Sequence, residues 1–426
     1  MSTSERGPFE GIRILEFGLA VAGPYAAELF AHGGADVVKI EPIEGDRTRF
    51  NSPIVPGEGR HYVIKARGKR GVPLNLRHSE ARAIARRLAL RSDILISNMR
   101  PGALAGLGLD YESLSAENPR IIVAEISAFG RHGPLGDMAG GDFQAGAAAG
   151  LMMSTGRFDQ DPPQFTDGHL SDFMAGTQLA FAVSTALYSR EHSGHGQHVT
   201  TSLYQASLAL QHATANVFDA VDGWKREFVD WVQEERPDPQ VASDRRRAQS
   251  PVLLGSLYRT ADDRWITLGS NAATLARLYD ALGIDEADRP EVPDDASSAP
   301  ANATPAERTA AVRRQIEAIT RTRDGEELLS ELQAQGVPCS LMESLEEVIL
   351  GEHARANGFM YEADHPVVGP MMMPGTPVNF SHDRYEPGDR TPAFGEHLRE
   401  VLGELDYSDD EIDRLIADQA VAETLP

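Results

Sequence analysis

The side chain with the clearest chemical potential is the carboxylate of Asp172, which stands directly before a long apolar segment. From Phe173 to Leu187 nearly every residue is small or apolar, which predicts a helix buried on most of its circumference. Ser171 or Asp172 is the expected N-cap, and the positive end of the helix dipole would keep a carboxylate there ionised. Such a carboxylate can be a nucleophile, although an aspartate before a helix more often only caps it.

A regular alternation of strands and helices must position this residue. Apolar strands are predicted at residues 11–17, 35–40, 93–97 and 121–127, with helices between them at 25–32, 79–90 and 111–117. This alternation predicts an α/β fold with a parallel sheet. Ligands of such sheets bind beyond the carboxyl ends of the strands. The candidate loops for a site are therefore residues 18–24, 98–102 and 128–134.

Two familiar motifs are missing from the sequence. The loop after the first strand reads GLAVAG instead of G-x-G-x-x-G, so a nicotinamide cofactor is not expected, although Glu41 ends the second strand like a ribose-binding acid. Residues 191–198, EHSGHGQH, hold three histidines separated by glycines, without an H-E-x-x-H motif. We expect a turn into a strand at 198–203 there, and no metal site.

Composition narrows the possible partners. The chain has 426 residues and a formal net charge of −24, which argues against nucleic acid and anionic membrane surfaces. No segment has the length of a membrane span or the pattern of a signal peptide. The single cysteine, Cys339, excludes an internal disulfide and a cysteine-rich metal site. A cytoplasmic location is expected.

The character of the chain changes after residue 216. Residues 217–249 are charged and interrupted, residues 253–271 hold two short strands around a turn, and residues 308–335 predict two helices. We therefore expect three segments, namely residues 1–216 as the first part of a large domain, residues 217–336 as a smaller α+β domain with its linkers, and residues 337–426 as a return to the large domain.

Several long motifs together resemble the family III CoA-transferases, which include formyl-CoA and carnitine CoA-transferases and 2-methylacyl-CoA racemases. The motifs cover nearly the whole chain in the family's order, and they read GIRILEF, AGPYAAELFAHGGADVVKIE, NMRPGALAGLGLDYESLSAENPRII, ISAFGRHGP, the Asp172 stretch with TALYSREHSGHGQHVTTSL, and GEHLREVLGELDYSDDEI. The resemblance implies a Rossmann-like large domain with a parallel sheet, a smaller α+β domain, and an interlocked homodimer.

In the transferases of this family an aspartate at the position of Asp172 attacks the carbonyl of an acyl-CoA. The resemblance therefore implies a mixed anhydride between Asp172 and the donor acyl group, with the CoA thiolate released but kept bound while a small carboxylic acid enters the exchange. Oxyanions form at each step, so backbone N–H donors should lie close to Asp172. The CoA thioester is a substrate in this chemistry, and no permanently bound cofactor is implied.

The racemases of the family supply the alternative function. They use a histidine directly before an aspartate, in a stretch that matches residues 139–142, together with a second aspartate. Here Gly141 occupies the histidine position, while Asp142 and Asp172 remain. Moving an α-proton from one face of a carbon to the other needs an acid or base on each face. The missing histidine therefore favours CoA transfer, with Asp142 as a supporting residue.

Further site residues follow from their positions in the family. Val21 stands where the formyl-CoA enzyme has a glutamine near the reaction centre, which argues against formate and oxalate as substrates. The positions implied to line the nucleotide of CoA or to contact its phosphates are Ala22, Arg47, Arg49, Lys69, Arg70, Asn98, Met99 and Arg100. Phosphates need cationic or backbone donors, although each of these arginines could equally be a solvated surface residue.

Overall fold

The chain folds into two compact units. The computed structural model describes residues 6–165, 168–212, 214–249, 257–269, 272–289, 305–365, 367–388 and 390–425. Unit 1 comprises Met1–Thr155, Phe165–Asn216 and Glu352–Pro426, and unit 2 comprises Gly156–Gln164 and Val217–Gly351. Within the described ranges, no helix is long and apolar enough to cross a lipid bilayer.

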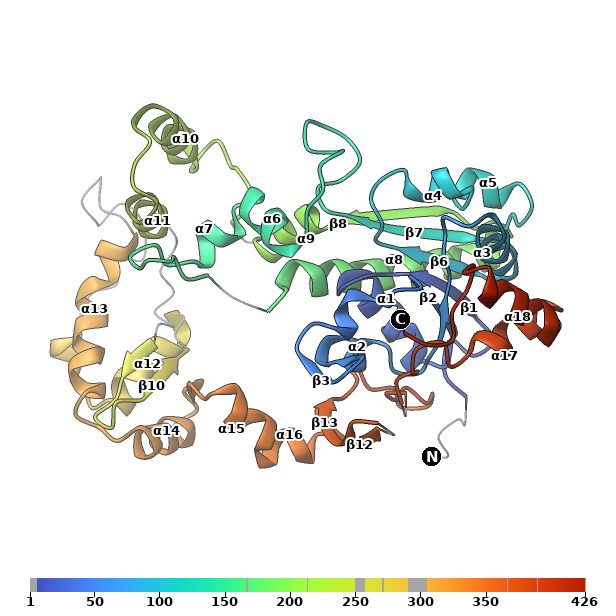
Figure 1. The fold of residues 1–426 in the computed structure, drawn as a ribbon. Helices are drawn as coiled ribbons and strands as arrows, with labels where there is room; N and C mark the ends of the chain where they lie inside the picture. The colour runs from blue at the N-terminus through green and yellow to red at the C-terminus, as the bar shows by residue number, and fades with distance from the viewer. Residues whose placement is uncertain are drawn as a thin grey trace. The chain divides into compact units, whose positions relative to one another are not determined.

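Unit 1 is built on a six-stranded parallel sheet with the strand order β5-β2-β1-β6-β7-β8 (Figure 1). The strands are β1 (Arg13–Phe17), β2 (Asp36–Glu41), β5 (Lys69–Pro73), β6 (Ile94–Ser97), β7 (Ile122–Ser127) and β8 (His198–Ser202). The predicted α/β fold with a parallel sheet is therefore confirmed. All carboxyl ends lie on one edge, where the loops after β1, β2 and β6 come together.

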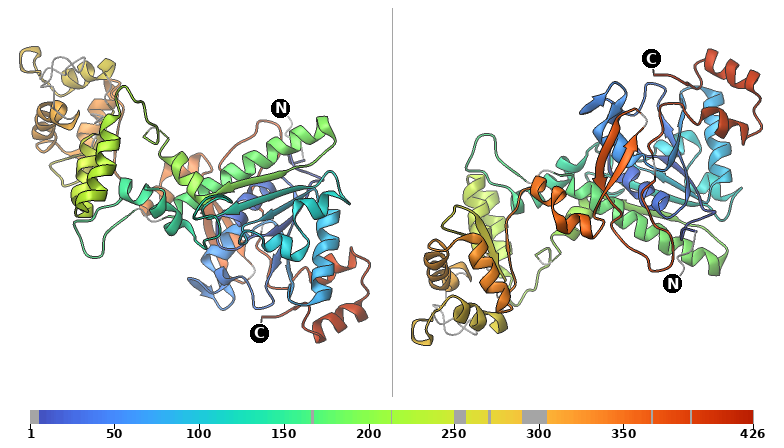
Figure 2. Two further views of the ribbon diagram at one scale, coloured as in Figure 1. Left: turned by 90° about the horizontal axis from the view of Figure 1, so that it is seen from above. Right: turned by 90° about the horizontal axis from the view of Figure 1, so that it is seen from below.

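Helices cover both faces of this sheet. They are α1 (Ala22–His32), α8 (Leu170–Ser193) and α9 (Leu203–Leu210) on one face, and α3 (Ser79–Arg91), α17 (Leu398–Gly403) and α18 (Asp409–Ala417) on the other. Successive strand residues point to opposite faces of the sheet, and both faces are apolar. Ile14 therefore packs toward α1 and α8, while its neighbour Leu15 packs toward α3. Figure 2 shows α8 running along the sheet. The C-terminal helices thus complete a core that the N-terminal strands begin.

Short elements fill the remainder of unit 1. They are η1 (Arg47–Arg49), β3 (Pro53–Val55), β4 (Glu58–Gly59), α2 (Arg60–Lys65), α4 (Ala103–Leu107), α5 (Tyr111–Ser115), α6 (Asp142–Ala148), α7 (Leu151–Thr155), α16 (Glu352–Ala356), β12 (Met360–His365) and β13 (Gly369–Pro374). Strands β12 and β13 form an antiparallel hairpin. The histidine-rich stretch ends α8 at Gly194, which has a φ of 76°, and then enters β8, as expected from its glycines.

Unit 2 has its own core and an antiparallel sheet of order β11-β10-β9. Its elements are α10 (Gly223–Glu235), α11 (Pro239–Ala248), β9 (Leu257–Arg259), β10 (Trp265–Leu268), α12 (Ala272–Ala281), η2 (Glu286–Asp288), α13 (Pro305–Thr320), α14 (Gly325–Ala334), β11 (Cys339–Leu341) and α15 (Leu345–Leu350). The charged segment 217–249, which was expected to be irregular, contains the two helices α10 and α11. Most of the loop expected at 285–305 lies outside the described residues.

The contact between α1 and α8 is unusually close at Gly176. A Cβ atom at this position would lie 2.8 Å from the carbonyl oxygen of Ala22 and 3.0 Å from the ring of Tyr25. Tyr25 also packs edge-to-face on Phe173, with 4.9 Å between the ring centroids. The absence of a side chain at Gly176 therefore sets the distance between the start of α1 and the first turns of α8.

Gly176→Ala should lower the free energy of unfolding by about 1–3 kcal/mol, because the added methyl group forces packed helices apart. Gly106→Ala in α4 is the matched control, since no heavy atom lies within 4 Å of a Cβ there and alanine favours a helix. Thermal melting of both variants checks this expectation. Equal melting temperatures for the two variants would contradict the close contact.

Candidate functional site

Asp172 lies in the first turn of α8 and is nearly buried, with 8% of its surface exposed. The prediction that Ser171 or Asp172 is the N-cap is wrong, because His169 occupies that position with a left-handed φ of 54°. The hydroxyl of Ser171 instead lies 2.7 Å from that of Ser207 on α9. Asp172 is thereby left without a capping role, and its carboxylate is available for chemistry.

Asp142 holds the backbone of Asp172 in place. Its Oδ1 atom accepts a hydrogen bond of 2.9 Å from the backbone N–H of Asp172. That N–H is one of the donors left free at the start of a helix, so Asp142, the first residue of α6, satisfies it from another element. The two carboxylates selected from the sequence are therefore neighbours in the structure.

The surroundings of Asp172 favour its protonated form. Burial, and then the charge of Asp142, raise the pKa of Asp172 to about 7, while Lys65 lowers it. The expectation that the helix dipole keeps this carboxylate ionised is wrong in direction, because removal from water outweighs the dipole. A carboxylate whose pKa lies near neutrality is more basic than a solvated one and is a stronger nucleophile when ionised.

Basic side chains also lie near Asp172. Nδ1 of His169 is 3.6 Å from Oδ2 of Asp172. The ring of His61, on α2, packs edge-to-face on His169 with 5.9 Å between the ring centroids. Lys65 ends the same helix, is 5% exposed, and acts electrostatically on Asp172. None of these three residues is predicted from the sequence, because no local pattern indicates that α2 packs near the start of α8.

A cavity of about 200 Å³ lies at the carboxyl ends of the strands. Its walls are mainly apolar and include Phe17, Leu19, Ile40, Pro42, Leu74 and Met99. Glu44 and Arg77 add charged groups to the lining. The loops after β1 and β6, two of the three expected to carry a site, both contribute to it. Arg77 is a cation at this cavity that the sequence did not single out.

Asn98 fixes the loop after β1. Its side-chain amide donates to the carbonyl of Leu19 at 2.7 Å, and its Oδ1 accepts from the N–H of Leu19 at 2.8 Å. Val21 is the N-cap residue of α1, and Ala22 is buried directly after it. Because Gly176 lies one turn beyond Asp172 and touches Ala22, this loop connects the cavity to the region of Asp172.

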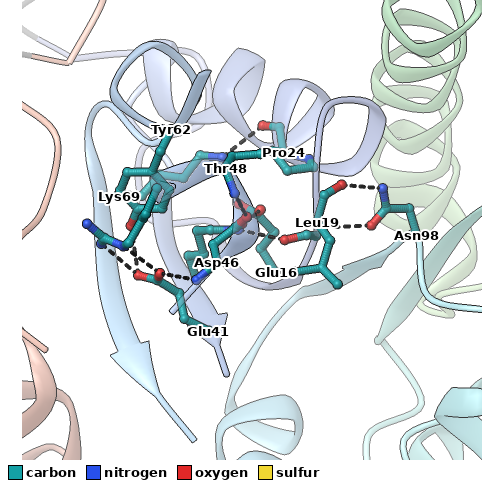
Figure 3. A network of polar contacts seen from close by, with 12 residues as sticks. Glu16, Leu19, Pro24, Glu41, Asp46, Thr48, Tyr62, Lys69 and Asn98 are labelled. Atoms are coloured by element: carbon teal, nitrogen blue, oxygen red, sulfur yellow. Dashed lines mark hydrogen bonds and ion pairs between the residues drawn. The ribbon is translucent and has the colours of Figure 1, made fainter. Parts of the chain in front are cut away.

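Two of the expected phosphate-binding cations are partners of buried carboxylates. Arg49 is fully buried and donates from Nε and Nη2 to Glu41 at 2.8 and 2.9 Å. Lys69 donates to Oε2 of Glu16 at 2.7 Å and to the carbonyl of Pro24 at 2.8 Å (Figure 3). Since the cations of Arg49 and Lys69 are buried and paired, they stabilise the loops around the cavity and do not line it.

The remaining expected cations are placed differently. Arg70, on the edge strand β5, pairs with Asp36 at 2.7 Å and with Glu404 at 2.6 Å, which ties the sheet to the end of α17. Arg47 in η1 and Arg100 after β6 are exposed. Both can be reached by a phosphate group from solvent.

The sequence matches the model of CoA-transferase family III over residues 9–398. It is 30% identical over 401 residues to succinyl-CoA–D-citramalate CoA-transferase of Chloroflexus aurantiacus, with 93% of this chain and 94% of that protein covered. It is also 30% identical over 416 residues to formyl-CoA:oxalate CoA-transferase of Bradyrhizobium sp., with 95% of each protein covered.

Solved structures agree in fold over most of the chain. The D175A mutant of Rv3272 from Mycobacterium tuberculosis superposes with a TM-score of 0.75 at 25% identity, covering 94% of this chain and 99% of that one. A CAIB/BAIF family protein from Brucella suis gives a TM-score of 0.71 at 27% identity, covering 94% of this chain and 100% of that one.

The parallel sheet and the full-length similarity place the protein among enzymes that transfer CoA. The chain belongs to CoA-transferase family III, and it is a CoA-transferase of the acyl-CoA:carboxylate type. CoA thioesters are therefore its substrates.

Asp172→Asn should stabilise the protein above pH 7 by an amount on the order of 4 kcal/mol. The pKa of Asp172 is raised from 3.8 to about 7. At a pH between these two values, Asp172 keeps its proton in the folded protein and loses it in the unfolded chain. The contribution of Asp172 to stability thus falls as pH rises through this window, and asparagine removes that loss.

Melting temperatures of wild type and Asp172→Asn, measured between pH 4 and 8.5, test this expectation. The difference should be near zero at pH 4 and should grow with pH. Asp137→Asn, which changes an exposed acid in the loop after β7, is the control and should show no such trend. A difference that is the same at every pH would rule out a raised pKa at Asp172.

Proposed function

We propose that this protein moves CoA from an acyl-CoA donor to a small carboxylic acid through mixed anhydrides on Asp172. The observation that carries the proposal is the nearly buried carboxylate of Asp172, whose backbone is held by Asp142 and whose pKa is raised to about 7. A carboxylate suits this role because the anhydride keeps the acyl group as activated as the thioester was.

The exchange then has three steps. A carboxylate oxygen of Asp172 attacks the donor carbonyl, the C–S bond breaks, and the CoA thiolate leaves with the electron pair. An oxygen of the acceptor carboxylate next attacks the Asp172 carbonyl carbon, which expels the donor acid as a carboxylate and forms a second anhydride. The bound thiolate finally attacks the acceptor's acyl carbon, which yields the new acyl-CoA and restores the Asp172 carboxylate.

The cavity at the strand ends is the proposed site of the nucleotide part of CoA. Its apolar walls suit a planar heteroaromatic ring, and Met99 and the Asn98-fixed loop lie at it. Exposed cations at Arg47 and Arg100 are the proposed phosphate contacts. Arg49, Lys69 and Arg70 would support CoA binding only indirectly, since all three are paired with carboxylates.

Short dicarboxylic acids are the first acceptors to test. Two related enzymes are named for succinyl-CoA with D-citramalate and for succinate with glutarate. Val21 argues against oxalate, which is the substrate named for another relative, because this position carries a polar side chain in the family's formyl-CoA enzymes. We therefore propose succinyl-CoA as the first donor to be examined.

We also propose that the enzyme is a homodimer, as the family resemblance implies. The outer face of α8 carries exposed aromatic side chains at Phe173, Phe181 and Tyr188, and the last two are 74% and 71% exposed. Large exposed apolar groups in a row on one helix face mark an interaction surface more often than a free one.

Phe181→Glu should shift the enzyme from dimer to monomer, because a charge in an apolar interface must lose its water without gaining a partner. Phe181→Leu, which keeps an apolar side chain, is the control. Sedimentation equilibrium gives the masses directly. A wild-type mass equal to that of one chain, 46.2 kDa, would refute the dimer.

Mass spectrometry of the intact protein tests the Asp172 anhydride. After mixing with succinyl-CoA, acetyl-CoA or butyrobetainyl-CoA, hydroxylamine should trap an adduct that maps to Asp172. Asp172→Ala should form none and should still bind CoA, whereas Asp161→Ala, an exposed acid outside the helix, should behave as wild type.

The same experiment separates transfer from racemisation. Suppose no adduct forms, but the α-hydrogen of a 2-methylacyl-CoA exchanges with deuterium from solvent. The racemase alternative then holds, and Asp142 with Asp172 would move the proton although Gly141 replaces the family's histidine.

A further inference from the structure

Lys65 differs from the other buried lysines of unit 1. Lys39 and Lys69 are both paired with Glu16, at 3.1 and 2.7 Å. Lys65 is 5% exposed, yet within the part of the chain that the structure describes its ammonium makes no hydrogen bond and no ion pair. A nearly buried ammonium without an acceptor is costly, so an anion that is not part of the chain would find a partner there.

The position of Lys65 on α2 brings it to the start of α8. His61 precedes it by four residues, so both side chains lie on one face of the helix. His61 contacts His169, and His169 lies 3.6 Å from Asp172. The charges of Lys65 and Asp172 act on each other as well. The ammonium and the carboxylate are therefore close without forming a direct ion pair.

We propose that Lys65 binds the carboxylate of the acid that exchanges on Asp172, and so selects and orients that acid. This inference rests on the function proposed above. An ammonium suits the task because its three donors rotate and accept a carboxylate in several orientations. A carboxylate that must attack a neighbouring carbonyl needs this freedom.

The charge balance changes during the reaction in a way that fits this role. In the free enzyme, the ionised Asp172 partly balances Lys65. When Asp172 bonds to the acyl carbon and the thiolate leaves with the C–S electron pair, the resulting anhydride is neutral. The negative charge thus passes from Asp172 to the bound CoA thiolate, and Lys65 no longer has the Asp172 carboxylate beside it at the step that requires an incoming carboxylate. Binding of that acid restores the balance beside the anhydride.

Lys65→Met and Lys65→Arg test the proposal in an isotope-exchange assay. The donor is whichever of succinyl-CoA, acetyl-CoA and butyrobetainyl-CoA forms the adduct, and the acceptor is its own acid labelled with ¹³C. At pH 7.5, Lys65→Met should raise KM for the acid roughly 10- to 100-fold, as expected for losing a hydrogen bond to a charged group. Lys65→Arg, which keeps the positive charge, should raise KM less than Lys65→Met does. Lys225→Met, in unit 2, is the control and should leave KM unchanged.

Adduct formation separates this role from an effect on Asp172 alone. Lys65 lowers the pKa of Asp172, so its loss also slows the first step near neutral pH. At pH 9 Asp172 is ionised in both proteins, and the adduct should form at the same rate in wild type and Lys65→Met. A KM defect at pH 7.5 together with a normal first step at pH 9 is the expected result.

The pH dependence of acid binding gives a second readout. Burial lowers the pKa of Lys65 to about 8, and the charged groups that act on it or face it are Glu28, Asp172, Asp46, Lys69 and His61. The KM of the wild-type enzyme for the acid should therefore rise above about pH 8. Lys65→Arg should show no rise there, because a guanidinium keeps its proton.

An unchanged KM in Lys65→Met, with the adduct still formed, would overturn the inference and leave the Asp172 mechanism intact. If wild type forms no adduct with any donor, the mechanism fails and the inference fails with it. If Lys65→Met melts far below wild type, the inference is tested instead by the pH dependence of KM for the acid in wild type and Lys65→Arg. Identical profiles for these two proteins would equally reject a role for Lys65.

Discussion

The pairing of buried charges at the carboxyl edge of the sheet is the constraint on which the rest of unit 1 depends. A fully buried charge without a partner costs several kcal/mol, so the chain must close around each one. Glu16 meets this demand with Lys39 and Lys69, and the two lysines also bind the carbonyls of Gly18 and Pro24. Both ends of the loop after β1 are fixed in this way, and with them the place where α1 begins.

Around Asp172 the buried charges are only partly paired. Asp142 binds the backbone of Asp172 and adds a second negative charge, while Lys65 lies close without completing a direct ion pair. The second negative charge raises the pKa of Asp172, and Lys65 has no direct ion-pair partner among the described residues. Such an arrangement costs stability locally, and it persists because the fully paired charges and the close α1–α8 contact at Gly176 hold the backbone.

Local patterns allowed part of this structure to be predicted from the sequence. The apolar runs predicted β1, β2, β6 and β7, and the turn after the histidine-rich stretch predicted β8. The N-cap prediction at α8 failed because His169 starts the helix in a left-handed conformation that residue preferences do not indicate. Strand β5 and helix α2 were not predicted. Their key residues, Lys69 and Lys65, act on groups far away in the sequence, and no spacing rule connects such pairs.

The two kinds of substrate in the proposed exchange make different demands, and the fold meets them with different elements. CoA needs an extended surface, and the loops around the cavity at the strand ends are the surface that we propose for it. An exchanging acid needs only a carboxylate-binding group beside Asp172, and Lys65 on α2 is the group that we propose for it. The contact of Ala22 with Gly176 joins the two regions through backbone atoms. A substitution at Lys65 should therefore alter the choice of acid while the loops around the cavity stay as they are.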